Sequence, residues 1–141
     1  SVSADAFEDA QRALERLRQN CYPDIDAEHL VTPEILVDGV VVEVGIGADG
    51  GTRAYIVSPE HLACDGKSAG LCGSRGCQIR IFAEDDAFSY VGWSPEVFSF
   101  NENVFLLLPH SGWVCDEVPN SSPCFSVLFW NDASQKFSYR K

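Results

Sequence analysis

The 141-residue sequence contains no methionine, few basic residues and no long apolar run. Ten Lys and Arg residues against twenty-one Asp and Glu residues give a net charge of −11 at pH 7. This balance argues against binding to nucleic acid or anionic membranes, because both are bound by clustered basic side chains. The apolar runs are far shorter than the roughly 20 residues that cross a bilayer, so we expect no transmembrane segment.

The apolar content is nevertheless high enough for a folded core. Hydrophobic residues make up 45% of the chain and aromatic residues 11%, which argues against disorder despite the charge. The length suits one domain, and we assign residues 1–141 to it. Because opposite charges attract across an interface, we expect the partner of this acidic chain to be a basic protein.

The six cysteines indicate the compartment. Three of them, with four glycines, fall in the segment from Cys64 to Cys77, which has too few apolar side chains to be ordered by burial. An even number of cysteines in such a chain predicts three disulfides and an oxidising compartment. A removed signal peptide would also explain why Met is missing at position 1. We therefore expect a periplasmic or secreted protein.

Spacing ranks the ways in which these cysteines can pair. It favours Cys115–Cys124, which closes a loop containing two prolines, and Cys72–Cys77, which closes a glycine-rich turn. The remaining bridge, Cys21–Cys64, would then attach the N-terminal helix to the rest of the domain. The closest competing set instead contains Cys64–Cys72 and Cys21–Cys77.

A zinc site is the alternative use of these cysteines. It would combine His61-x-x-Cys64 with Cys72 and Cys77, since tetrahedral zinc takes such ligands. Strong zinc signals are paired Cys-x-x-Cys or His-x₃-His units, and neither occurs in this sequence. An exported chain also favours disulfides. We therefore expect no metal and no cofactor.

The secondary-structure pattern predicts one helix followed by strands. Residues 5–20 form the predicted helix, because apolar side chains recur there at steps of three and four. Turn signals then separate short alternating runs, which indicates hairpins. We predict an α+β fold in which the N-terminal helix packs on an antiparallel β-sheet of about six to seven strands within residues 38–141. The predicted strands are 40–45, 53–58, 78–83, 88–93, 104–108, 124–130 and 136–140.

The same periodicity predicts which side chains lie inside. On the helix, the apolar face should contain Phe7, Ala10, Leu14, Leu17 and Cys21. The aromatic residues that follow alternate as core residues would, so most are expected to be buried. These aromatic residues are Trp93, Phe98, Phe100, Phe105, Phe125, Phe129 and Trp130.

The cysteine segment and the C-terminal part of the chain carry a resemblance. Cys64-Asp-Gly, Leu71-Cys-Gly-Ser-Arg-Gly-Cys77, the His110-Ser-Gly-Trp-Val-Cys115 loop and the aromatic strand ending at Trp130 resemble a group of uncharacterised exported proteins of alphaproteobacteria with a C-G-[ST]-x-G-C loop. The resemblance covers residues 10–140. It implies a periplasmic location and agrees with disulfides, but it brings no activity or catalytic residues.

Our first functional hypothesis is an exported, disulfide-stabilised, acidic binding module, such as an inhibitor or immunity-type protein. It would present a rigid cysteine-closed loop to its partner, with no catalytic residues. Three side chains in or beside loops are the expected contacts: Arg75 at the tip of the Cys72–Cys77 turn, Trp113, and His110 beside it.

Two alternatives belong to other functional classes. A small periplasmic hydrolase would use His110 with Ser111 or Asp116, and it requires a concave pocket where these side chains converge. A structural envelope component would instead show no pocket and no apolar patch large enough for a partner.

Overall fold

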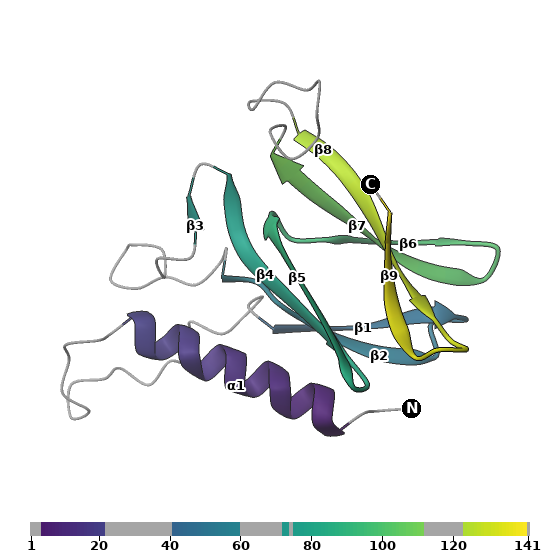
Figure 1. Ribbon diagram of the computed structural model, residues 1–141, viewed down its shortest axis with the longest axis horizontal. Helices are drawn as coiled ribbons and strands as arrows, with labels where there is room; N and C mark the ends of the chain where they lie inside the picture. Colours follow the sequence, from purple (N-terminus) through teal and green to yellow (C-terminus); the bar gives the residue numbers. More distant parts are fainter. Residues whose placement is uncertain (1–3, 22–40, 60–71, 74, 112–122, 141) are drawn as a thin grey trace.

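The computed structural model describes residues 4–21, 41–59, 72–73, 75–111 and 123–140. These residues form one helix packed on a curled antiparallel sheet (Figure 1), which is the predicted α+β fold. All the predicted strands are present, and two additional ones, β3 and β6, bring the described sheet to nine. The elements are α1 (Ala4–Cys21), β1 (Val41–Ala48), β2 (Thr52–Val57), β3 (Cys72–Gly73), β4 (Gly76–Ala83), β5 (Asp86–Gly92), β6 (Glu96–Phe100), β7 (Asn103–Ser111), β8 (Pro123–Asn131) and β9 (Lys136–Arg140).

Helix α1 packs through small side chains, and its buried face differs from the predicted one. Phe7, expected inside, is 43% exposed, and its ring meets that of Tyr55 edge-on at 5.5 Å. The inward positions are occupied mainly by alanine, whose small side chain allows the helix to lie close to the sheet. The described residues that α1 buries are Ala6, Ala10, Ala13 and Leu17. No helix in the described parts of the chain is long and apolar enough to cross a membrane.

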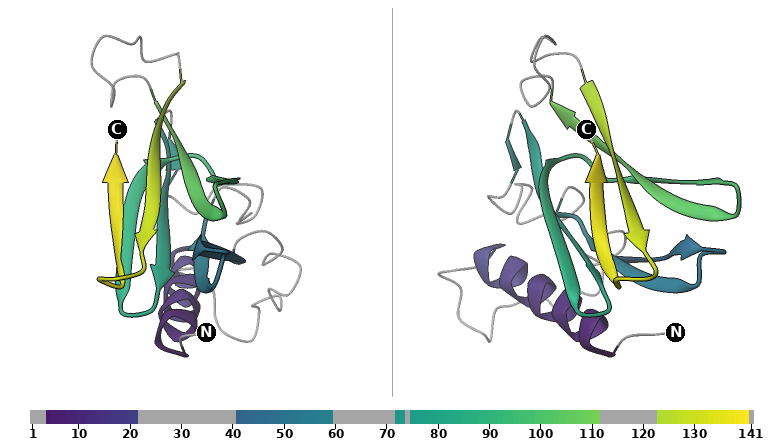
Figure 2. Two further views of the ribbon diagram at one scale, coloured as in Figure 1. Left: turned by 90° about the vertical axis from the view of Figure 1, so that its right-hand side faces the viewer. Right: turned by 45° about the vertical axis from the view of Figure 1, so that its right-hand side comes forward.

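The sheet has a path of seven strands in the order β3-β4-β2-β1-β7-β8-β9, with β5 beside β4 and β6 beside β7. It curls so that strands distant along this path approach one another (Figure 2). The amide of Trp93, just after β5, donates to the carbonyl oxygen of Pro109 on β7 at 3.1 Å. The amide of Phe137 on β9 donates to the carboxylate of Asp86 at 2.8 Å. These bonds tie the β4–β5 hairpin to the other half of the sheet.

Two apolar clusters hold the fold together, one on each face of the sheet. The inner cluster fills the concave side of the curl and includes Ile79, Leu106 and Trp130. The outer cluster lies between α1 and the convex side of β2 and β4, where Tyr55, Val57 and Phe82 meet the buried face of the helix. Such burial of apolar surface is the main source of stability.

Two tight hairpin turns lie next to each other at one end of the sheet. Asp49 and Gly50 in the β1–β2 turn both have positive φ, as do Asn101 and Glu102 in the β6–β7 turn. This is the conformation of type I′ turns, whose twist matches that of the paired strands. The amide of Asp49 donates to the carbonyl oxygen of Glu102 at 2.6 Å, so the two turns support each other.

Candidate binding surface

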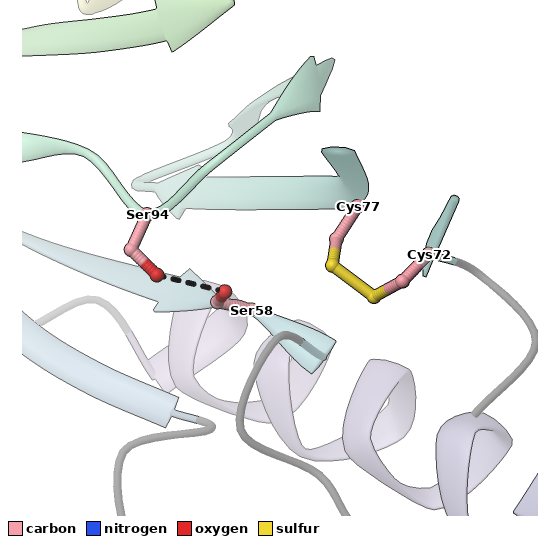
Figure 3. Close-up of a disulfide and its surroundings, with 4 residues drawn as sticks. All are labelled: Ser58, Cys72, Cys77 and Ser94. Carbon is pink, nitrogen blue, oxygen red and sulfur yellow. Dashed lines mark hydrogen bonds between the residues drawn. A yellow bond between two sulfur atoms is a disulfide. The ribbon is translucent and has the colours of Figure 1, made fainter. Parts of the chain in front are cut away.

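The hairpin of β3 and β4 is closed by the predicted bridge between Cys72 and Cys77, which face each other across the pair (Figure 3). This bond excludes the competing pairing. Cys124 is also disulfide-bonded, and none of the described cysteines is free. The side chains of Cys21, Cys64 and Cys115 lie outside the described residues, so the other two predicted bridges remain predictions.

Two close approaches near this hairpin involve the ends of β2 and β5. Ser58 after β2 and Ser94 after β5 share a hydrogen bond of 3.0 Å between their hydroxyl oxygens, close to the disulfide in Figure 3. Gly76 has φ +108°, and a side chain there would strike the backbone of Gly92. Arg75 is exposed at the turn between the two cysteines and remains a candidate contact residue.

His110, predicted to contact a partner, lies in the interior of the sheet and is only 3% exposed. Its Nδ1 lies 3.4 Å from the carbonyl oxygen of Val91, which can only accept a hydrogen bond. This contact favours the tautomer with the proton on Nδ1, so that Nε2 accepts a hydrogen bond from the hydroxyl of Ser126. The rings of Tyr90 and Tyr139 pack edge-on against the imidazole. The burial of His110 leaves almost none of its surface for a partner.

A histidine bonded to a serine is the arrangement that activates a nucleophile. Ser126, which sequence reasoning missed, is buried together with His110 in the sheet, so the pair faces the core and not solvent. The side chain of Ser111 and all of Asp116 lie outside the described residues, as does Trp113. The hydrolase hypothesis, which uses Ser111 or Asp116 with His110, therefore stays a prediction.

The convex side of β6, β7 and β8 carries an aromatic surface that sequence analysis assigned to the core. Phe98 is 39% exposed, Phe125 48% and Phe100 66%. Trp93, Phe105 and Phe129 are half-buried, so the prediction that most of these aromatic residues are buried is wrong. The cause is the alternation of the strands. Inward positions of β7 and β8 hold the residues of the inner cluster, and the next residue along each strand must then face outward. We call this outward surface the aromatic face; it comprises Phe98, Phe100, Phe105, Leu107, Phe125, Val127 and Phe129.

The rings of the aromatic face pack against one another across the strands. Phe98 pairs with Phe105 in register, with their ring centroids 5.2 Å apart. Phe105 meets Phe129 edge-on at 6.1 Å. The guanidinium of Arg140 lies over the outer ring of this row, 5.8 Å from the centroid of Phe129. Mutual packing fixes the rings in place while leaving part of their surface open to solvent.

Acidic side chains lie at the end of the sheet where the hairpin turns meet. Asp132, in the β8–β9 turn, accepts a hydrogen bond from the amide of Ala48 at 3.1 Å and lies beside Gly47. The adjoining β1–β2 and β6–β7 turns contribute Asp49 and Glu102, both exposed. The aromatic face is therefore bordered by carboxylates at this end.

Comparisons with known proteins add no family to these observations. No family model, curated protein or solved structure matches the chain. Among the described residues, no group of three or more His, Cys, Asp and Glu side chains is placed to hold a metal ion.

Proposed function

We propose that this chain is an exported, non-catalytic binding module, of the inhibitor or immunity type, that docks a basic protein on its aromatic face. The observation that carries this proposal is the aromatic face: Phe98, Phe100 and Phe125 are exposed on β6 and β8. The ring of Phe98 packs on Phe105, which in turn meets Phe129. Contiguous exposed apolar surface of this kind is typical of protein interaction sites.

The aromatic face has the properties of a good anchor. The rings of Phe98, Phe105 and Phe129 are restrained by their contacts with one another, so little of their conformational freedom is lost when a partner covers them. Aromatic side chains also bury large areas and are enriched where binding energy is concentrated. The type I′ turn at Asn101 and Glu102 matches the twist of β6 and β7 and favours their pairing.

Charge favours a basic partner over a second copy of the chain. Two copies would each bring a net charge of −11, and their repulsion opposes association. Asp49, Glu102 and Asp132 at the edge of the face would instead attract basic side chains on a partner. Such rim charges mainly accelerate association and set its salt dependence.

The exposed apolar patch on β6, β7 and β8 favours the binding module over its alternatives. A structural envelope component was expected to show no such patch. The hydrolase hypothesis needs His110 to meet Ser111 or Asp116 in a concave pocket, whereas the described partner of the buried imidazole is Ser126. The binding module is therefore the function that the described residues support best.

The test removes the aromatic face without touching the core. The double variant Phe98→Gln with Phe125→Gln changes two outward residues on β6 and β8, and Val91→Gln on β5 is the control, because Val91 is 44% exposed on another strand. Wild type and variants are immobilised and exposed to envelope extract at low and high salt. We expect the wild type and the control to retain the same basic protein, at low salt above all, and the double variant to lose it.

Purified candidate partner then gives the affinity, and thermal unfolding verifies that every variant is folded. Equal retention by the double variant and the wild type would overturn the proposal. Concentration-dependent dimerisation of the wild type, abolished in the double variant, would identify a second copy as the occupant and would refute the basic partner.

A further inference from the structure

A groove between α1 and the convex side of β4 and β5 is lined by basic side chains, although the chain as a whole is acidic. It has a volume of about 420 Å³, within the range of small-ligand sites, and adjoins a smaller hollow of about 230 Å³. Arg16 on α1 and Arg80 on β4 line both. No carboxylate is among the described residues that line the larger groove, although acidic residues outnumber basic ones by two to one in the chain.

The two arginines are available to a ligand. Arg12, one helical turn from Arg16, forms an ion pair with Asp9 in the smaller hollow. No described carboxylate lies within salt-bridge distance of Arg16 or Arg80. A pair of guanidinium groups facing one groove from two elements is therefore not neutralised by the described part of the chain. Arginine is suited to bind carboxylate and phosphate oxygens through two parallel hydrogen bonds.

The sheet positions the polar wall of the groove. Gln78, Arg80 and Phe82 alternate along β4 and therefore share its convex face. Ser89 on β5 is the register partner of Arg80 and lines the same groove. The guanidinium of Arg80 lies 4.9 Å above the ring of Phe82, a cation–π contact that restrains its position.

The floor of the groove is apolar. Ala13, Leu17 and Val57 line it and belong to the cluster that joins α1 to the sheet. An inorganic anion would leave this surface in contact with water. A carboxylate attached to an apolar body would instead place its oxygens at the arginines and its body on the floor.

We infer that this groove is a second binding site, which takes an organic carboxylate between Arg16 and Arg80, with Gln78 and Ser89 as further hydrogen-bond donors. The ligand is either a free small acid or an acidic side chain next to an apolar one in a peptide. The site lies under α1, whereas the aromatic face lies on strands that α1 does not cover (Figure 1). The two sites are therefore independent, and this inference does not rest on the proposed function.

The experiment measures binding of four probes to the full chain by NMR titration and calorimetry. These probes are 3-phenylpropionate, its neutral amide, inorganic phosphate, and a capped hexapeptide of alternating leucine and glutamate. We expect the two carboxylate probes to bind at the groove and the amide and phosphate to bind at least about tenfold more weakly, since hydrogen bonds to charged groups are the stronger ones. Tighter binding of the peptide than of phenylpropionate would identify a protein segment as the ligand, and the reverse order would identify a free acid.

Two matched charge changes locate the site. Arg16→Gln removes a groove cation from an exposed helix position and should weaken binding of phenylpropionate about tenfold. Arg53→Gln removes the same charge from β2, where Arg53 faces Glu43 at 3.4 Å outside the groove, and should change the affinity less than about twofold. Equal weakening by both variants, or equal binding of phosphate or of the amide, would overturn the inference. The aromatic-face double variant should bind phenylpropionate as the wild type does, which keeps this test separate from that of the proposed function.

Discussion

The convex surface of the sheet has two halves that differ in how far their side chains are buried. On β2 and β4, outward residues such as Tyr55 and Phe82 are almost completely buried, because α1 lies across them. On β6, β7 and β8, outward residues such as Phe98 and Phe125 remain 39% and 48% exposed. Both halves place aromatic side chains on the same side of one sheet, and only the first is covered by the described helix (Figures 1 and 2).

The comparison shows that an apolar strand face does not by itself identify the core. A cover from the chain's own helix makes such a face a source of folding stability. Without that cover the same chemistry leaves an accessible surface that another molecule can bury. Mutations in the two halves should therefore separate stability from binding.

The largest contrast is expected between Phe82→Ala and Phe98→Ala, which make the same change in the two halves. Removing the ring of Phe82 beneath α1 should lower the free energy of unfolding by about 3–5 kcal/mol. Removing the ring of Phe98 should cost about 1 kcal/mol or less, because this side chain is 39% exposed and packs on Phe105 at the surface of the sheet. Urea denaturation followed by circular dichroism measures both. Similar losses for the two variants would mean that the aromatic face is part of the folding core.

A medium effect is expected at Gly92, where the β5 segment approaches β7. A Cβ at this position would collide with the carbonyl oxygen of Pro109, which also accepts the hydrogen bond from Trp93. Gly92→Ala should therefore destabilise the domain by about 1–3 kcal/mol through overpacking. Gly73→Ala is the control, since a Cβ there meets no atom within 4 Å and should cost about 0.5 kcal/mol or less. Both values come from thermal unfolding, and a neutral Gly92→Ala would show that the two strands can separate at little cost.

The smallest effect concerns Tyr55 in the covered half and appears only in alkali. Burial raises the pKa of Tyr55 above its ordinary value of 10.0; the nearby Glu43 raises it further, while Arg53 opposes the shift. The unfolded chain therefore loses this proton at lower pH than the folded one. The contribution to stability is complete below pH 10 and declines as the pH rises towards the folded-state pKa.

Comparison with Tyr55→Phe isolates this contribution. Stability measured by urea unfolding should fall more steeply above pH 10 in the wild type than in the variant. Absorbance at 295 nm should show a late tyrosine ionisation in the wild type that is missing in Tyr55→Phe. Parallel pH profiles of stability for the two proteins would contradict the assignment.

Most of the fold could be predicted because its signals are local. The helix range, the β1–β2 hairpin and the terminal strands follow from periodicity and from glycine-rich turns. Strand β6 was missed because its turn, Asn101–Glu102, takes positive φ values without the glycine that usually indicates a type I′ turn. The buried helix face was misjudged because the spacing of apolar residues included Phe7, whereas close packing against the sheet selected Ala6 and Ala13.

The candidate surfaces were harder to predict because they depend on which elements cover each face of the sheet. Sequence analysis ranked Arg75 and His110 as contacts from their places at loops, but His110 turned out to face Ser126 in the core. A signal for the aromatic face did exist. The continuous apolar run at the start of β7 and the aromatic residues of both parities in β8 show that both sides of these strands are apolar. Whether another element of the chain packs over the outer side of these strands depends on tertiary packing, which periodicity does not predict.

The aromatic face also sets a limit on the solution conditions in which copies of the chain stay apart. At neutral pH the net charge of −11 opposes association of molecules whose phenylalanine rings are exposed. The isoelectric point is near 4.5, so mild acid removes this repulsion while leaving the apolar surface unchanged. The surface that we propose for recognition at neutral pH would then become the starting point for precipitation in acid.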